Sequence, residues 1–152
     1  MMLESLRKLL LGDEAELSRP DDRQLAAAAL LIGAAAEDGS YDPVERDTIL
    51  TLLEKSFDLK PADAAELMAV AEQQAERAVG LHRFVTILNR DLDAADKIKL
   101  IEMLWEVTYA DGRLDDYEAN LMRRLGGLLG VSDFERGEAR KRVLARLAAR
   151  DR

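Results

Sequence analysis

The chain has 152 residues, 48% of them apolar and 34% charged, and it carries a formal net charge of −8. This length suits a single domain, here residues 1–152, and the acidic excess disfavours nucleic-acid binding because phosphate backbones would be repelled. The absence of cysteine excludes disulfides, thiolate nucleophiles and cysteine-bound metal sites.

The residue types favour helix along nearly the whole chain. Leu and Ala carry most of the apolar share, and strand-forming aromatic residues make up only 5%. We therefore expect an all-α, single-domain bundle of about eight helices. No apolar run approaches the roughly 18 residues of a membrane span, and the N-terminus lacks the apolar core of a signal peptide. We expect a cytoplasmic protein that does not associate with membranes.

Periodicity and capping residues place the helices in chain order. The first covers about 2–11 and is expected to pack over the bundle, and the second covers about 22–37. The second is so rich in alanine that we expect it to be central and closely packed. The later helices are expected from Pro43 to about 56, over about 61–78, around Phe84 and Leu88, from about 94 to 111, over about 116–129, and from Ser132 or Asp133 into the tail.

One acidic pattern, Asp-Gly-x-x-Asp-x-x-Glu, occurs twice in the chain. The two copies lie 73 residues apart, and an apolar frame follows the same offset, for example Leu31 with Leu104. Such agreement predicts an internal duplication, with repeats of approximately 21–60 and 94–133. The matched polar and glycine positions are Asp38 with Asp111, Gly39 with Gly112, Asp42 with Asp115 and Glu45 with Glu118.

Helix capping accounts for part of this pattern. Asp42 and Asp115 are suited to the N-cap position, where a carboxylate accepts hydrogen bonds from free backbone N–H groups. Glu45 and Glu118 follow three residues later, at the reciprocal position of a capping box. Capping therefore explains these four residues without any ligand.

The first acidic residue of each copy is harder to explain. Asp38 and Asp111 fall at expected helix C-termini, where the macrodipole disfavours an anion. Either they stabilise the turn by hydrogen bonding, or the carboxylates bind calcium or magnesium, which prefer oxygen ligands. The alternating loop ligands of an EF-hand are missing. In the metal hypothesis the ligands are Asp38, Asp42, Glu45, Asp111, Asp115 and Glu118.

At these residues the sequence resembles the tellurite-resistance protein B (TerB) family. The resemblance is carried by Ala-Asp-Gly-Arg-Leu-Asp-Asp-Tyr-Glu at 110–118 and by the related stretch at 36–45, and it extends over roughly 21–148. It implies an all-α fold with two pseudo-symmetric halves, a link to tellurite resistance and stress responses, and metal binding at the six acidic positions. The first copy has Glu37 where the second has Ala110, which indicates a divergent branch.

Four other features of the sequence are candidates for a functional role. His82 is the only histidine, so metal sites rich in histidine are excluded. From its neighbours Leu81, Arg83 and Phe84 we expect it to be a surface or partly buried helix residue without a catalytic role. Trp105 lies among apolar neighbours and is expected in the core. Gly126 and Gly127 are expected to permit close helix packing. The basic segment 136–152 is predicted to be a solvated helix face, with contact to an acidic partner or membrane as the alternative.

The sequence leaves three functional hypotheses. The preferred one is a non-enzymatic binding module that binds a divalent cation at its acidic turns. The second is a protein-interaction scaffold, with an unidentified protein partner, whose acidic turns only cap helices. The third, a hydrolytic enzyme, would require a pocket that joins carboxylates from both halves.

Overall fold

The computed structural model describes residues 22–37, 41–111 and 116–150, and for residues 111 and 116–118 it describes the backbone alone. Within these ranges every element is helical. The elements, in chain order, are α3 (Asp22–Glu37), α4 (Pro43–Ser56), α5 (Pro61–Arg77), α6 (His82–Asp91), α7 (Ala94–Thr108), the short 3₁₀ helix η1 (Tyr109–Asp111), α8 (Asp116–Leu128) and α9 (Asp133–Arg150).

The predicted all-α class is confirmed, and the helix bounds agree with the sequence-based ones to within a few residues. The expected first helix, over 2–11, lies outside the described residues, so seven α-helices are described where eight were expected. None of the described helices combines the length and the apolar character needed to cross a membrane.

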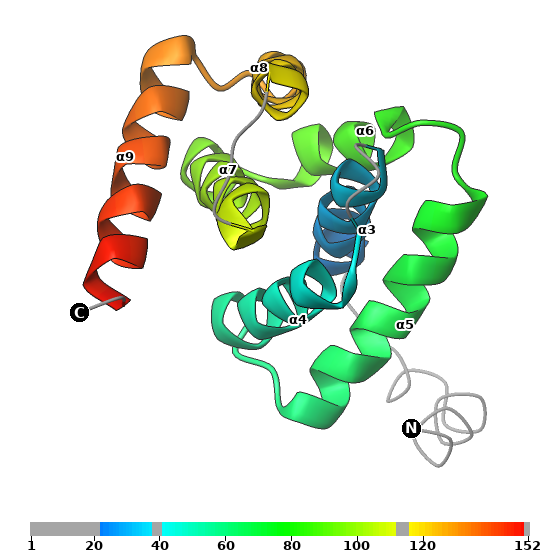
Figure 1. Ribbon diagram of the computed structural model, residues 1–152. Coiled ribbons are helices and arrows are strands. Elements are labelled where there is room, and N and C mark those ends of the chain that lie inside the picture. Colours follow the sequence, from blue (N-terminus) through cyan, green and yellow to red (C-terminus); the bar gives the residue numbers. More distant parts are fainter. Residues whose placement is uncertain (1–21, 38–40, 112–115, 151–152) are drawn as a thin grey trace, which may run out of the picture.

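Helix α3 forms the centre of the core, as its alanine content predicted. Nine of its 16 residues are buried, and Leu30 and Leu31 are fully enclosed. The helix contacts α4, α5, α6 and α7, because alanine side chains allow neighbouring backbones to approach closely on several sides (Figure 1).

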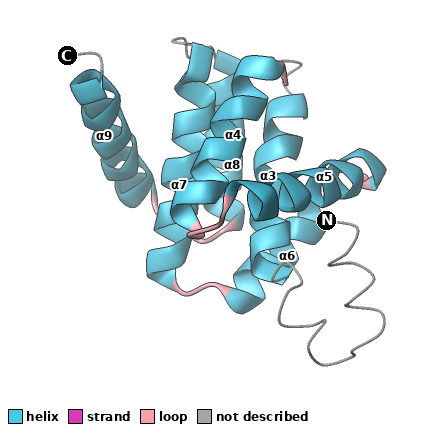
Figure 2. Ribbon diagram, turned by 90° about the horizontal axis from the view of Figure 1, so that it is seen from below, coloured by secondary structure: helices cyan, strands magenta, loops and turns pink. Residues whose placement is uncertain are grey.

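The order of helices repeats along the chain. Helices α3, α4 and α5 correspond to α7, α8 and α9, which begin 72, 73 and 72 residues later. Within each set every helix contacts the other two: α3, α4 and α5 contact one another, and so do α7, α8 and α9. Helices α5 and α9 lie on opposite sides of the central pair α3 and α7 (Figures 1 and 2). The duplicated acidic turn is thus the link between the first two helices of each set.

The third helices of the two sets bury different amounts of apolar side chain. Four α5 residues are buried, including Leu67 and Met68, whereas α9 buries Ala139 and Val143. The positions equivalent to Leu67 and Ala71, 72 residues later, are Ala139 and Val143. Because α9 has so little apolar surface against α7, polar contacts must contribute more to its attachment.

Candidate acidic site at the repeated helix junction

The first acidic turn begins α4 with an N-cap aspartate. Asp42 has extended backbone geometry (φ −104°, ψ 176°), and its Oδ1 accepts a hydrogen bond of 2.9 Å from the backbone N–H of Glu45. Pro43 follows at the first helical position, where its missing N–H leaves no helical hydrogen bond unmade. The predicted cap is confirmed. A carboxylate has about four acceptor sites, so this single bond leaves the exposed Asp42 able to bind a further donor or a cation.

Glu45 is one of two buried charged side chains that the structure describes, and it is only 4% exposed. It lines a cavity of about 10 Å³, together with residues of α3, α7 and α8. A cavity of this size is at the lower limit for one water molecule, about 10–15 Å³. Its position places a carboxylate inside the interface between the two sets of helices.

The walls of this small cavity follow the repeat. Leu31 of α3 and Leu104 of α7 both line it, and these residues are 73 positions apart. Ala35 of α3 and Thr108 of α7 form a second such pair. The cavity therefore lies where equivalent positions of the two helix sets face one another. The counterpart of Glu45 at this offset is Glu118, whose side chain is outside the described part of the structure.

The other four predicted metal ligands lie wholly or partly outside the described residues. Asp38 and Asp115 lie outside the described residues, and Asp111 and Glu118 are described by their backbone alone, at the end of η1 and in the first turn of α8. Among the described side chains no three His, Cys, Asp or Glu residues are grouped to hold a metal ion. Asp42 and Glu45, one helical turn apart, are the predicted ligands whose side chains are described.

A second polar cluster joins α4 to α5 beside the acidic turn. The Tyr41 hydroxyl donates to Glu72 Oε2 at 2.6 Å, and Arg46 donates to both Glu72 oxygens at 3.2 Å. Burial, then the hydrogen bond to Glu72, raises the pKa of Tyr41 above its usual range. Burial alone would raise the pKa of Glu72, but hydrogen bonds from Arg46 and Tyr41 outweigh it and lower that pKa. This cluster stabilises the chain segment that enters α4.

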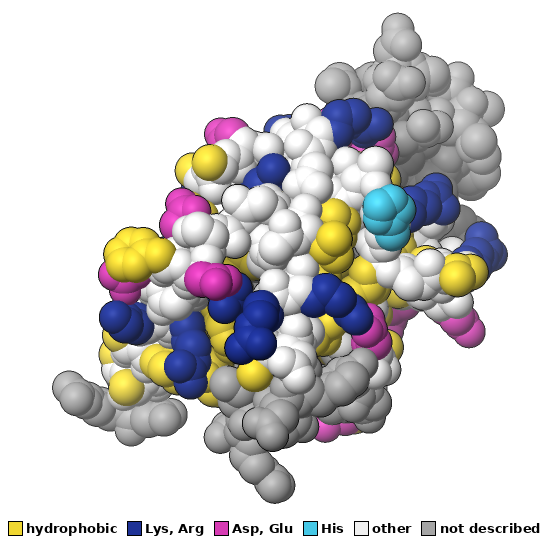
Figure 3. Space-filling model, turned by 90° about the horizontal axis from the view of Figure 1, so that it is seen from above, with side chains coloured by type: hydrophobic (Ala, Val, Ile, Leu, Met, Phe, Trp, Pro, Cys, Tyr) yellow, Lys and Arg dark blue, Asp and Glu magenta, His cyan; other side chains and the backbone are white. Residues whose placement is uncertain are grey.

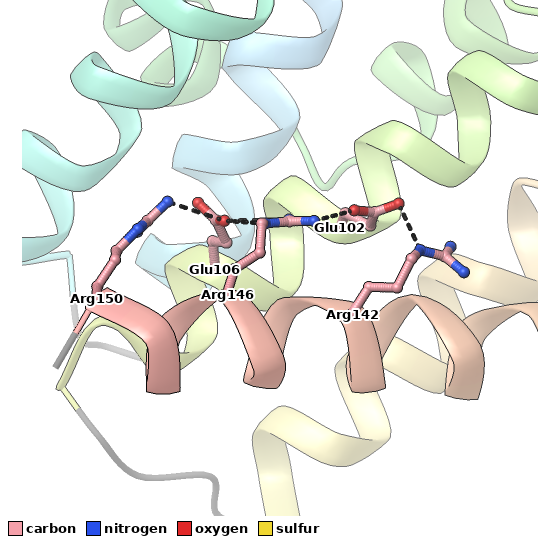
Figure 4. Close-up of polar contacts among 5 residues, drawn as sticks. All are labelled: Glu102, Glu106, Arg142, Arg146 and Arg150. Atoms are coloured by element: carbon pink, nitrogen blue, oxygen red, sulfur yellow. Dashed lines mark hydrogen bonds and ion pairs between the residues drawn. The ribbon is translucent and has the colours of Figure 1, made fainter. Parts of the chain in front are cut away.

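A third cluster attaches α9 to α7, and Figure 4 shows its side chains in an alternating row. Glu102 accepts from Arg142 at 3.2 Å and from Arg146 at 2.6 Å. Glu106, which is 5% exposed, accepts from Arg146 at 3.1 Å and from Arg150 at 3.5 Å. Two glutamates one turn apart on α7 are thus matched by three arginines one turn apart on α9. We call these five residues the α7–α9 ion-pair ladder.

The basic tail is exposed along most of its length, as predicted for a solvated helix face, but its arginines also make contacts within the fold. Three of its arginines pair with α7, and a fourth, Arg140, places its guanidinium 5.7 Å from the Trp105 ring and donates to the Tyr109 hydroxyl at 2.6 Å. The sequence contained one signal of this ladder: its glutamates are four residues apart on α7, and its arginines are four residues apart on α9. It became informative only once α7 and α9 were known to be neighbours.

The remaining sequence predictions are resolved by burial. Trp105 is 4% exposed and donates through Nε1 to the carbonyl of Arg136, so its core placement is confirmed. His82 is exposed, and the histidine side chain lies on the surface in Figure 3. Gly126 is buried close to Arg136, as expected for close packing. Gly127 is exposed, and a side-chain Cβ at this position would meet no neighbouring group within 4 Å, so the prediction of close packing is wrong for Gly127.

Comparison with known proteins identifies a family that this chain matches. The family model described as tellurite resistance protein TerB matches residues 24–141, which is 118 of the 152 residues. The matched range includes both acidic turns and ends one residue before Arg142, the first arginine of the ion-pair ladder. Searches of curated proteins and of solved structures returned no match. The extent of the family match, together with the all-helical fold, shows that this chain belongs to the TerB family.

Proposed function

We propose that this chain is a non-enzymatic binding module of the TerB type that binds a divalent cation, calcium or magnesium, at its acidic turns. Tellurite resistance, the process named in the family description, is the setting in which we expect it to act. The ligand candidates are the six repeated carboxylates, Asp38, Asp42, Glu45, Asp111, Asp115 and Glu118.

The burial of Glu45 is the observation that carries the proposal. A metal ion is one of the groups that stabilise a carboxylate removed from water, and it can act beside hydrogen bonds and opposite charges. Helix capping by Asp42 does not require the next carboxylate of the motif to be buried. The position of Glu45 between the two helix sets therefore supports a role beyond capping.

The donor set suits a hard cation. The candidates are all carboxylates, and oxygen is the ligand atom that calcium and magnesium prefer. The chain has no cysteine and its single histidine, His82, begins α6 rather than an acidic turn, which disfavours zinc or copper at this place.

The sharpest test keeps the helix cap while removing charge. Asparagine caps helices about as well as aspartate, so Asp42→Asn should leave the fold intact and weaken calcium or magnesium binding at least about tenfold. Asp93→Asn is the matched control, because Asp93 caps α7 through the same kind of bond, 2.8 Å from its Oδ1 to the Asp96 N–H, outside the acidic turns. Titration calorimetry measures both variants. Absence of cation binding in the unaltered chain, or equal losses in both variants, would refute the proposal.

The second candidate is a protein-interaction scaffold in which the acidic turns only cap helices. The hydrogen bond from the Glu45 N–H to Asp42 favours it, because that bond already gives Asp42 a structural role. In this case Asp42→Ala should destabilise the chain by about 1 kcal/mol, and calcium should leave the melting temperature unchanged. A melting temperature that rises with calcium concentration in the unaltered chain, and does not rise in Asp42→Asn, would favour the metal-binding module.

A further inference from the structure

A cleft separate from the acidic turns lies between α3, α4, α7 and α9. Its volume is about 560 Å³, and neither Asp42 nor Glu45 is among the described residues that line it. Binding sites for small molecules commonly measure about 300–1,000 Å³, so the cleft is large enough for a ligand of that class. The α7–α9 ion-pair ladder forms part of one wall, through Glu102, Glu106, Arg146 and Arg150.

Arginine side chains of α9 form one edge of the cleft. Helix α9 itself buries only small side chains, Ala139 and Val143, whereas α5 buries larger ones that include Leu67 and Met68. The long arginine side chains of the ladder span from α9 to α7 and keep the two helices attached at the edge of the cleft. The space next to them remains open.

The floor of the cleft is apolar. It includes Leu52 of α4 and Leu100 and Met103 of α7, each less than 10% exposed, and the partly buried Phe57 and Leu92 lie beside them. An apolar ligand body placed there would remove further hydrocarbon surface from water.

The rim of the cleft is basic, although the chain as a whole is acidic. The described residues that line it include five basic side chains against three acidic ones. Two of the three acidic side chains, Glu102 and Glu106, already accept hydrogen bonds from the ladder arginines. Lys55 and Lys99, from α4 and α7, have no described carboxylate within 4.0 Å of their ammonium groups and can pair with an incoming anion.

A depression on the other side of the molecule provides a comparison. It is formed by α3, α5, α6 and α8, and it includes Leu125 and Leu128, which lie 73 residues after Leu52 and Lys55. Among the residues that line it, Arg124 pairs with Glu37, and a leucine stands where the cleft has Lys55. The basic rim is therefore a property of the α9 side and does not follow from the repeated fold alone.

From an apolar floor and a basic rim, we infer that the cleft binds a small amphipathic anion, namely a carboxylate carried on an apolar chain. The carboxylate pairs with Lys55 and Lys99, and the apolar chain lies over Leu100 and Met103. This inference does not depend on cation binding at the acidic turns.

The experiment uses the full chain and two dyes of similar shape. Anilinonaphthalene sulfonate is an amphipathic anion, and phenylnaphthylamine is its neutral counterpart. We expect the anionic dye to bind with a rise in fluorescence, to be displaced by dodecanoate and not by dodecanol, and to bind more weakly as salt is raised. The neutral dye should bind at least about threefold more weakly.

Charge-neutralising variants locate the site. Lys55→Gln and Lys99→Gln should each weaken dodecanoate binding roughly two- to fivefold, as expected for a partly exposed ion pair. Lys60→Gln is the matched control, because Lys60 is an exposed lysine of the α4–α5 link that does not line the cleft, and it should bind as the unaltered chain does. Lys55, Lys99 and Lys60 are all exposed, so helical content should be unchanged in the three variants.

Three results would overturn the inference. Equal binding of the two dyes would show that charge does not matter, and equal weakening in Lys60→Gln would show that the anion binds elsewhere. Sedimentation that reveals a dimer disrupted by Lys55→Gln and Lys99→Gln would show that a second copy of the chain, rather than a small anion, occupies the cleft.

Discussion

Glu106 of α7 and Arg146 of α9 form an ion pair in which one carboxylate oxygen, Oε1, accepts a hydrogen bond from Nε and also lies close to Nη2. Both distances, to Nε and to Nη2, are 3.1 Å, and Glu106 is 5% exposed while the Arg146 side chain is 43% exposed. Burial alone would lower the pKa of Arg146, but hydrogen bonds to Glu102 and Glu106 outweigh this and raise that pKa. The carboxylate is therefore enclosed by α7 and its neighbours, and the arginine reaches it from the more exposed α9.

Glu106→Gln should lower the free energy of unfolding by about 1–2 kcal/mol. Removing one partner of a fully buried pair costs about 3–5 kcal/mol, and the partial exposure of Arg146 reduces that figure. Urea denaturation measures the loss. The control is Glu138→Gln, which removes an exposed pair with Lys141 and should change stability by less than about 0.5 kcal/mol. Equal losses in the two variants would mean that the burial of Glu106 has no energetic consequence.

The Tyr41–Glu72–Arg46 cluster should make stability depend on acidic pH. The pKa of Glu72 is lower in the folded chain than its usual 4.5, so its contribution is fully present above pH 4.5 and is lost as pH falls through the folded-state pKa. Glu72→Gln should therefore cost about 1 kcal/mol at pH 7, and the difference from the unaltered chain should shrink below pH 4.5. Glu76→Gln, an exposed change on the same helix, should cost about 0.5 kcal/mol or less. A pH-independent difference for Glu72→Gln would contradict this assignment.

The two adjacent glycines of α8 should respond oppositely to alanine. Gly127 is exposed in a helix and a Cβ there meets no atom within 4 Å, so Gly127→Ala should stabilise the chain by about 0.5–1 kcal/mol. Gly126→Ala should gain less or destabilise, because its Cβ would lie 3.2 Å from Arg136 Cδ and 3.7 Å from the Val131 carbonyl oxygen. Thermal unfolding of the two variants compares them directly. A larger gain at Gly126 would show that Arg136 moves away without penalty.

Helix α9 should open more readily than α5. It buries two residues where α5 buries four, and its ladder arginines are partly exposed and accessible to salt. Hydrogen exchange should therefore be at least about tenfold faster for amides in the middle of α9 than for those in the middle of α5, and the difference should grow at high ionic strength. Equal protection of the two helices would indicate that the ladder compensates fully for the missing apolar contacts.

Local sequence determined the helices themselves. The Asp42 cap, Pro43 at the first helical position and the Asp93 cap act within one turn of chain, and the predicted helix starts match these contacts. The alanine content of α3 likewise predicted a central helix, because small side chains admit close neighbours on every side. The family was also recognisable from residues 110–118, since that motif requires only adjacent positions.

Tertiary structure decided which side chains act together. The sequence placed Asp42 and Glu45 in one motif but did not show that Asp42 is exposed while Glu45 is enclosed between the two helix sets. It showed glutamates and arginines at matching spacing but not that Glu106 meets Arg146, 40 residues later. Caps and helical periodicity depend on neighbours within four residues, whereas burial, interhelical ion pairs and the cleft beside α9 depend on how whole helices pack against one another.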